Sequence, residues 1–76
     1  MTFELDPNAN AAYVQISGRA VLSTRELDSQ RIVDCGADGE IVGIEFLGVS
    51  RGVDLRGLPH REQMAKFFDE HHIHVN

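Results

Sequence analysis

The chain has 76 residues, enough for one domain and too few for a second hydrophobic core. It carries 12 acidic and 7 basic residues, for a net charge of -5, and its arginines are spread along the chain beside acidic neighbours. Because phosphate backbones repel an acidic surface, this pattern makes nucleic-acid binding unlikely. The sequence lacks both the apolar run of about 18 residues that a membrane span needs and the pattern of a signal peptide at residues 1–6. We therefore expect a cytoplasmic protein that does not enter the membrane.

The single cysteine, Cys35, excludes a disulfide within the chain. A domain of this size buries only about 60% of its unfolded surface. Natural domains of this length often gain stability from disulfides, a metal or a second chain. We therefore expect a homo-oligomer, most simply a dimer.

The first half of the chain predicts three strands. Residues 3–6 alternate with Phe3 and Leu5 on one face, and the turn that follows at residues 6–10 contains an Asp-Pro pair. Residues 12–16 alternate in the same way. Residues 20–27 predict a weaker strand, and their polar side chains are typical of an exposed sheet edge.

Residues 31–47 predict a β-hairpin, because two β-branched runs flank a Gly-Ala-Asp-Gly turn. A two-residue turn at Asp38-Gly39 places Val33 opposite Ile44. A three-residue loop at 37–39 instead places Val33 opposite Gly43. The two registers direct the apolar side chains differently, because a slip of one residue moves every side chain to the other face.

Burial decides between these registers. The three-residue loop would gain an ion pair between Arg31 and Glu45 of about 0.2–1 kcal/mol. Each apolar side chain that moves into the core contributes about 1.5–3 kcal/mol. The two-residue turn gathers five apolar side chains on one face: Val33, Cys35, Val42, Ile44 and Phe46. We therefore predict the two-residue turn, with Cys35 in the core opposite Val42.

The second half of the chain predicts a glycine-rich connection followed by a helix. Proline is accepted in the first helical turn, so Pro59 favours a helix over residues 59–72. Four residues follow helical spacing along this segment and form one amphipathic face: Met64, Phe67, Phe68 and His71. The prediction is a single α+β domain over residues 1–76. An antiparallel β-meander of about five strands (3–50) leads through a connection (51–58) to a C-terminal amphipathic helix (59–72) packed on one face, and then to a tail (73–76).

Three motifs carry a resemblance to a known family. They are Leu-Asp-Pro-Asn-Ala-Asn-Ala-Ala-Tyr-Val at residues 5–14, Ile-Val-Asp at 32–34, and Asp-Gly-Glu-Ile-Val-Gly-Ile-Glu at 38–45. In these motifs the chain resembles the bacterial domain of unknown function 2283 family over roughly residues 3–50. It departs from the family pattern at Asn10, where a second acidic residue is expected, and this weakens the case for an acidic site in the turn. The family has no established activity. Some members resemble partners in toxin–antitoxin-like gene pairs, which implies a protein-binding, antitoxin-like role.

The histidines at the C-terminus form the one cluster of metal-ligand type. His71 and His72 are adjacent, and adjacent residues on a helix do not face each other. His72 and His74 would need further ligands. We therefore expect an exposed, frayed helix end and assign no metal site. The Asp6 turn lacks the glycine and glutamate of an EF-hand loop, so we expect it to be an Asx-type turn.

The start of the predicted helix offers the one candidate for acid–base chemistry. His60 is expected in the first helical turn, where the helix dipole disfavours a positive charge, and a neutral imidazole there could act as a general base beside Asp54 or Glu62. The sequence places no nucleophile or oxyanion donor there, so we assign no catalytic residue and no cofactor. A small ligand-binding domain or enzyme with a site at His60, Asp54 and Glu62 is therefore the alternative function. For Asp34 and Glu45 we expect ion pairs with Arg25 and Arg31.

The leading hypothesis is a small cytoplasmic protein-interaction module, a homodimer that binds a protein partner. It rests on the short chain, the lack of a catalytic constellation, and a sheet with only one helix to cover it. An uncovered face or edge strand favours association with another chain.

Overall fold

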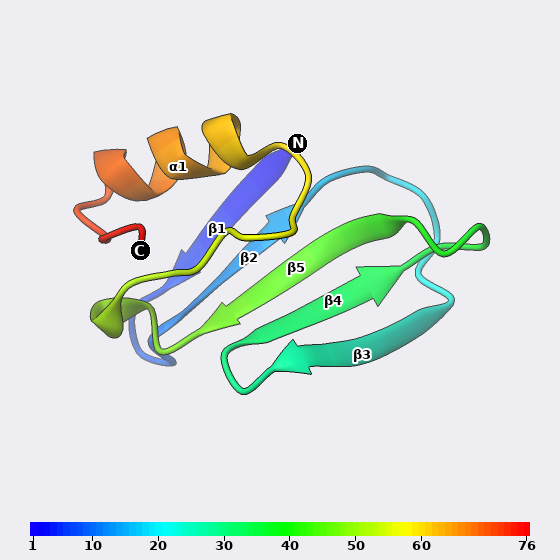
Figure 1. Cartoon of the computed structure of the whole chain (residues 1–76), viewed down its shortest axis with the longest axis horizontal. Coiled ribbons are helices and arrows are strands. Elements are labelled where there is room, and N and C mark those ends of the chain that lie inside the picture. Colours follow the sequence, from blue (N-terminus) through cyan, green and yellow to red (C-terminus); the bar gives the residue numbers. More distant parts are fainter.

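The computed structural model covers residues 1–76 and contains one five-stranded antiparallel sheet and one C-terminal helix (Figure 1). The α+β fold class is therefore confirmed. The elements are β1 (Thr2–Asp6), β2 (Ala11–Gln15), β3 (Ser23–Asp28), β4 (Arg31–Cys35), β5 (Ile41–Leu47), a short 3₁₀ helix η1 (Val49–Arg51) and α1 (Arg61–Glu70).

The strands lie in the order β1-β2-β5-β4-β3. The meander thus consists of two sequential units, the β1–β2 hairpin and the β3–β4–β5 unit, which join where β5 pairs with β2. β1 and β3 form the two edges of the sheet (Figure 1).

The two strands of the central hairpin pair in the predicted register, but the turn that joins them differs from the prediction. Val33 lies opposite Ile44 and Arg31 opposite Phe46, as the two-residue turn predicted. The turn itself is a three-residue loop at residues 37–39, so the prediction of a two-residue turn was wrong.

A β-bulge reconciles this loop with the observed register. The Gly36 N–H donates to the Glu40 carbonyl at 2.9 Å and closes the loop, with Gly39 at φ 77°. The register then shifts between Asp34 and Cys35, so that Cys35 lies opposite Ile41 and not Val42. The bulge adds one extra residue to β5. The pairing beyond the bulge is therefore shifted by one residue and has the register that burial favours, although the loop has three residues.

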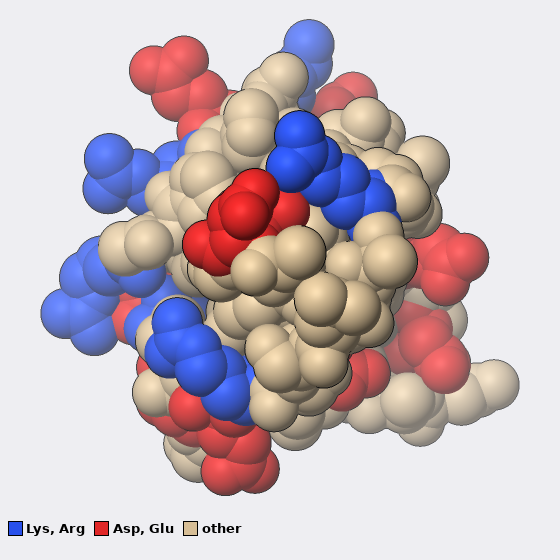
Figure 2. Space-filling model, turned by 90° about the vertical axis from the view of Figure 1, so that its right-hand side faces the viewer, with Lys and Arg blue, Asp and Glu red and all other residues tan.

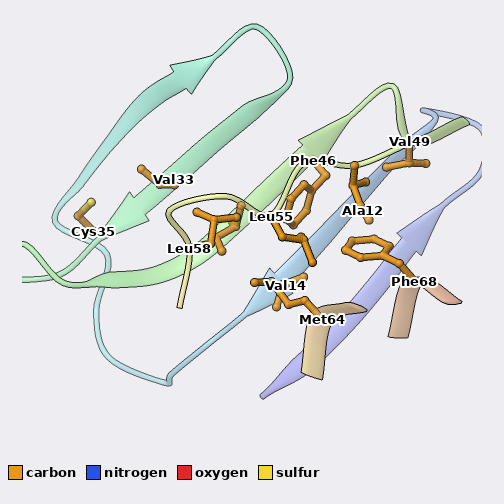
Figure 3. Close-up of a cluster of buried hydrophobic side chains, with 12 residues drawn as sticks. Ala12, Val14, Val33, Cys35, Phe46, Val49, Leu55, Leu58, Met64 and Phe68 are labelled. Atoms are coloured by element: carbon orange, nitrogen blue, oxygen red, sulfur yellow. The ribbon is translucent and has the colours of Figure 1, made fainter. Parts of the chain in front are cut away.

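One face of the sheet forms the hydrophobic core. Val33, Cys35, Ile44 and Phe46 are buried there, as predicted. Val42 is also buried but lies outside this cluster, because the bulge changes its place in the strand. The core is completed by residues from β2, the connection and the helix: Ala12, Val14, Val49, Val53, Leu55, Leu58, Met64 and Phe68 (Figure 3).

Aromatic contacts seat α1 on the sheet. The ring of Phe68 meets that of Phe46 edge to face, with the centroids 5.2 Å apart. Phe67 stacks on Phe3 of β1 at 4.3 Å. The helix therefore lies toward the β1 side of the sheet, and β3 forms the opposite edge (Figure 1).

The helix is shorter at both ends than the predicted span of 59–72. His60 has a left-handed backbone (φ 57°), so the helix begins at Arg61. His72 is also left-handed (φ 59°) and ends it. There the His72 N–H donates to the Asp69 carbonyl at 3.1 Å and the Ile73 N–H to the Phe68 carbonyl at 2.8 Å. This is the Schellman pattern of a capped helix end.

The tail after α1 is held in place, which corrects the expectation of a frayed end. Val75 forms a parallel bridge with Val53 of the connection. The Val53 N–H donates to the His74 carbonyl, and the Asn76 N–H donates to the Val53 carbonyl, both at 2.8 Å. The tail therefore fastens the connection beside the sheet.

A buried arginine joins the same connection to the sheet. Arg31 is 8% exposed and lies at the end of the core face. Its Nε donates to an Asp28 carboxylate oxygen at 2.9 Å, and its NH1 donates to the carbonyls of Asp54 (3.2 Å) and Arg56 (2.7 Å). One guanidinium thus links the β3–β4 turn to the segment that carries Leu55 into the core.

We predict that His72→Gly stabilises the protein. Glycine adopts a left-handed backbone without the steric cost of a Cβ, so the gain is about 1 kcal/mol. A domain of this size then melts about 4–8 °C higher. His71→Gly is the matched control, because His71 has φ -103° and gains nothing from glycine. A melting temperature of His72→Gly at or below that of the wild type would contradict the assignment of this cap.

We predict that Arg31→Ala lowers the free energy of unfolding by about 1–3 kcal/mol, because it leaves two carbonyls of the connection without their donor. Arg25→Ala is the control: Arg25 lies in β3 and is exposed, so its loss costs less than about 0.5 kcal/mol. Urea denaturation measures both variants. Equal effects would show that Arg31 contributes no more than a surface arginine.

Candidate functional site

The sheet face opposite α1 carries a polar row that crosses four strands. The hydroxyl of Tyr13 in β2 donates to one carboxylate oxygen of Asp34 in β4 at 2.7 Å. The Thr24 hydroxyl in β3 donates to the other oxygen, also at 2.7 Å. The expected ion pair of Asp34 with an arginine is therefore wrong, because both carboxylate oxygens are occupied by hydroxyl donors.

Gly43 of β5 makes this row possible. It lies opposite both Gln15 and Asp34, between the two strands that the tyrosine spans. A Cβ at Gly43 would collide with the Tyr13 hydroxyl. The absence of a side chain in β5 therefore lets the phenol reach across that strand to Asp34.

The row is a structural link and not an acid–base pair. Burial, the hydrogen bond to Asp34 and the charges of Asp34 and Glu45 together raise the pKa of Tyr13 to about 12, and burial is the largest of these causes. At neutral pH the phenol therefore keeps its proton and acts as a hydrogen-bond donor.

The β3 edge is a part of the sheet that the rest of the chain leaves uncovered. All six residues of β3 are exposed. Three large apolar side chains lie in or just before it with substantial exposure: Val21 (48%), Leu22 (66%) and Leu27 (37%). The predicted third strand thus begins at Ser23, and its exposed character is as expected.

The hydrogen-bond pattern shows which backbone groups of β3 are free. The Leu47 N–H donates to the Gln30 carbonyl at 2.8 Å, so the backbone N–H and C=O groups of even-numbered residues along β4 point toward β5. The backbone N–H and C=O groups of odd-numbered residues in β4 therefore point toward β3, where Val33 lies opposite Arg25. In consequence the backbone N–H and C=O groups of Thr24 and Glu26 point away from the sheet.

The structure does not bring His60 and Asp54 together. Asp54 is engaged by Arg56, whose Nε and NH2 lie 2.8–3.0 Å from its carboxylate oxygens, and this contact lowers the pKa of Asp54. The exposed His60 contacts Gln63 through Nδ1 at 3.0 Å. An open depression of about 540 Å³ contains His60 and Glu62 without Asp54.

The C-terminal histidines serve the packing of the helix end. His71 Nδ1 lies 2.9 Å from the Phe67 carbonyl, and its ring lies against the Phe67 ring at 4.3 Å. The structure has no group of three or more His, Cys, Asp or Glu side chains placed to hold a metal ion. Cys35 is a free thiol buried in the core.

The turn after β1 connects two distant segments, a role that its sequence does not reveal. Asp6 accepts a hydrogen bond from the Ala9 N–H at 3.1 Å, as expected of an Asx-type turn. Asn10 has a left-handed backbone, donates through Nδ2 to the Ser50 hydroxyl and accepts from the Ser50 N–H, each at 2.9 Å. The residue that departs from the family pattern therefore ties β1–β2 to η1.

Acidic and basic side chains are mixed on the end of the molecule shown in Figure 2, where neither sign forms a continuous patch. Ion pairs account for part of this mixing, since Arg19 lies 3.3 Å from Glu40 and 3.9 Å from Asp38. The single helix, of 10 residues, is too short to cross a membrane.

We predict that the Tyr13 phenol titrates near pH 12 in the folded protein and near pH 10 in the unfolded chain. In the Asp34→Asn variant its midpoint should fall below that of the wild type but stay above that of the unfolded chain, because burial still raises the pKa of Tyr13. Stability from this group is present below pH 10 and is lost as pH rises toward 12, because the unfolded chain releases the proton first. Tyr13 is the only tyrosine, so the ultraviolet absorbance of tyrosinate reports it directly. A wild-type midpoint at the ordinary value for tyrosine would contradict the burial of the Tyr13 hydroxyl and its hydrogen bond to Asp34.

Comparison with known proteins assigns the chain to a family of unknown function. No curated protein and no solved structure matches the sequence. The model of one family, described as a protein of unknown function (DUF2283), matches residues 3–50. The matched segment contains β2 to β5 and all of β1 except Thr2, so the family motifs form the sheet. The chain belongs to the DUF2283 family.

Proposed function

We propose that the protein is a small cytoplasmic protein-interaction module that associates through the β3 edge, and that a second copy of the chain occupies this edge. The observation that carries the proposal is a six-residue edge strand in which every residue is exposed. Its outer backbone groups have no partner within the chain.

The chemistry of this edge suits the addition of a strand. The free N–H and C=O groups of Thr24 and Glu26 are the donors and acceptors that an added strand uses. Exposed Val21 and Leu22 lie at the start of the strand and offer apolar area to a partner. Exposed long edges of this kind are usually protected or used for association.

The other edge is less suited to pairing. Phe3 and Leu5 of β1 are partly buried against the core cluster, and Phe3 stacks on Phe67 of α1. A strand added beside β1 would lie close to the helix. This asymmetry favours β3 as the edge that associates.

A strand from a different protein would compete with the second copy for the same edge. An antitoxin-like role, in which that protein is a toxin-like partner, is the form of this interaction that the family resemblance suggests. Such a partner would have to displace the second copy, so its binding would convert dimers into mixed complexes.

We predict that the wild type forms a reversible dimer and that Thr24→Lys raises its dissociation constant at least about tenfold, or ~1.4 kcal/mol. A lysine in an edge strand opposes pairing, and beside Asp34 it remains compatible with the fold. Sedimentation equilibrium over a concentration series measures the effect.

Thr2→Lys is the matched control for this experiment. Thr2 is an exposed edge threonine of β1, and its hydroxyl bonds to Gln15 as that of Thr24 bonds to Asp34. Thr2→Lys should leave the dissociation constant unchanged. The proposal fails if the wild type is a monomer at every concentration, or if both variants weaken the dimer equally.

A further inference from the structure

We infer that two copies of the chain pair β3 with β3 in an antiparallel manner about a two-fold axis at Thr24, so that two five-stranded sheets become one continuous sheet of ten strands. This inference rests on the proposed function and specifies the register of the contact.

Symmetry restricts the registers that are available. In an antiparallel pair, residues directly opposite each other point to the same face of the sheet. Neighbouring residues in one strand point to opposite faces. Two identical strands related by a two-fold axis must therefore be centred on a residue, which lies opposite itself in the second copy.

Charge excludes two of these centres. An axis at Arg25 places two arginines directly opposite each other, and an axis at Glu26 does the same with two glutamates. Like charges in directly opposite positions are destabilising. The strand is irregular at Leu27, because its register shifts between Glu26 and Asp28, and an axis at Asp28 would again oppose two like charges. The centre must therefore lie closer to the start of the strand.

The length of the regular strand selects Thr24. With an axis at Ser23, the first residue of β3, only Ser23 lies opposite a β3 residue of the other copy. The following residues of β3 then lie opposite the segment that precedes the strand. An axis at Thr24 pairs Ser23, Thr24 and Arg25 within the strands. This paired segment also ends before the register shift between Glu26 and Asp28, where β3 becomes irregular.

The Thr24 register also keeps like charges apart. The two Thr24 residues lie opposite each other, and their outward backbone groups form the central hydrogen-bonded pair. Arg25 of each copy lies opposite the neutral Ser23 of the other, and Glu26 lies opposite the neutral Leu22. The exposed Val21 and Leu27 lie outside the regular part of the strands.

Homotypic disulfide formation tests the register directly. Opposite residues of a hydrogen-bonded pair have Cα atoms about 5.5 Å apart, within the range of a disulfide. Positions one residue away from the axis are roughly 7–8 Å from their own counterparts, which is too far. Only the residue on the axis should therefore cross-link with itself.

The experiment compares Leu22→Cys, Ser23→Cys and Thr24→Cys after mild oxidation, on non-reducing gels, because these variants keep the charges of Arg25 and Glu26. The wild type is the control for Cys35, which is buried and should not cross-link. Light scattering of the same samples under reducing conditions reports whether each variant is a dimer before oxidation. We expect Thr24→Cys to form most of the cross-linked dimer.

The possible results separate this inference from the proposed function. Stronger cross-linking of another variant than of Thr24→Cys would overturn the register and leave association through β3 in place. Dimers by light scattering that no variant cross-links would overturn pairing through β3. Monomers in every sample would overturn both the register and the proposed function.

Discussion

The pairing of β4 with β5 determines which side chains lie in the core and which remain on the open face. This register puts Val33 and Ile44 on the same face as Phe46, the residue on which α1 packs through Phe68. The same alternation directs Asp34 to the other face, where it meets Tyr13 and Thr24. A slip of one residue would exchange these two sets of side chains. The bulge before Gly43 is therefore as important to the fold as the apolar residues themselves.

The limited size of the covering layer explains why one edge remains open. A helix of 10 residues and the connection before it are the segments that cover the core face. Arg31 holds the connection over β4, and the aromatic contacts of Phe67 and Phe68 draw the helix toward β1 and β5. These contacts leave β3 without a covering layer.

Much of the fold was predictable from the sequence, because alternation and burial act locally. The strands, the apolar face with Cys35 and the C-terminal helix follow from these patterns. The polar row was not predictable, because Tyr13 reaches Asp34 only through strand order and the missing side chain at Gly43. The helix bounds were wrong because His60 and His72 adopt left-handed backbones that their sequence does not require. The candidate site at His60 failed to form because Arg56 holds Asp54 elsewhere.

Amide hydrogen exchange at low and high protein concentration tests whether the β3 edge is an interaction surface. The N–H groups of Thr24 and Glu26 point away from the sheet, so they should exchange freely in the dilute protein and become protected as concentration rises. The outer N–H groups of Phe3 and Leu5 in β1 should show the same exchange rates at both concentrations. Free exchange of Thr24 and Glu26 at every concentration, or equal new protection at both edges, would contradict the account.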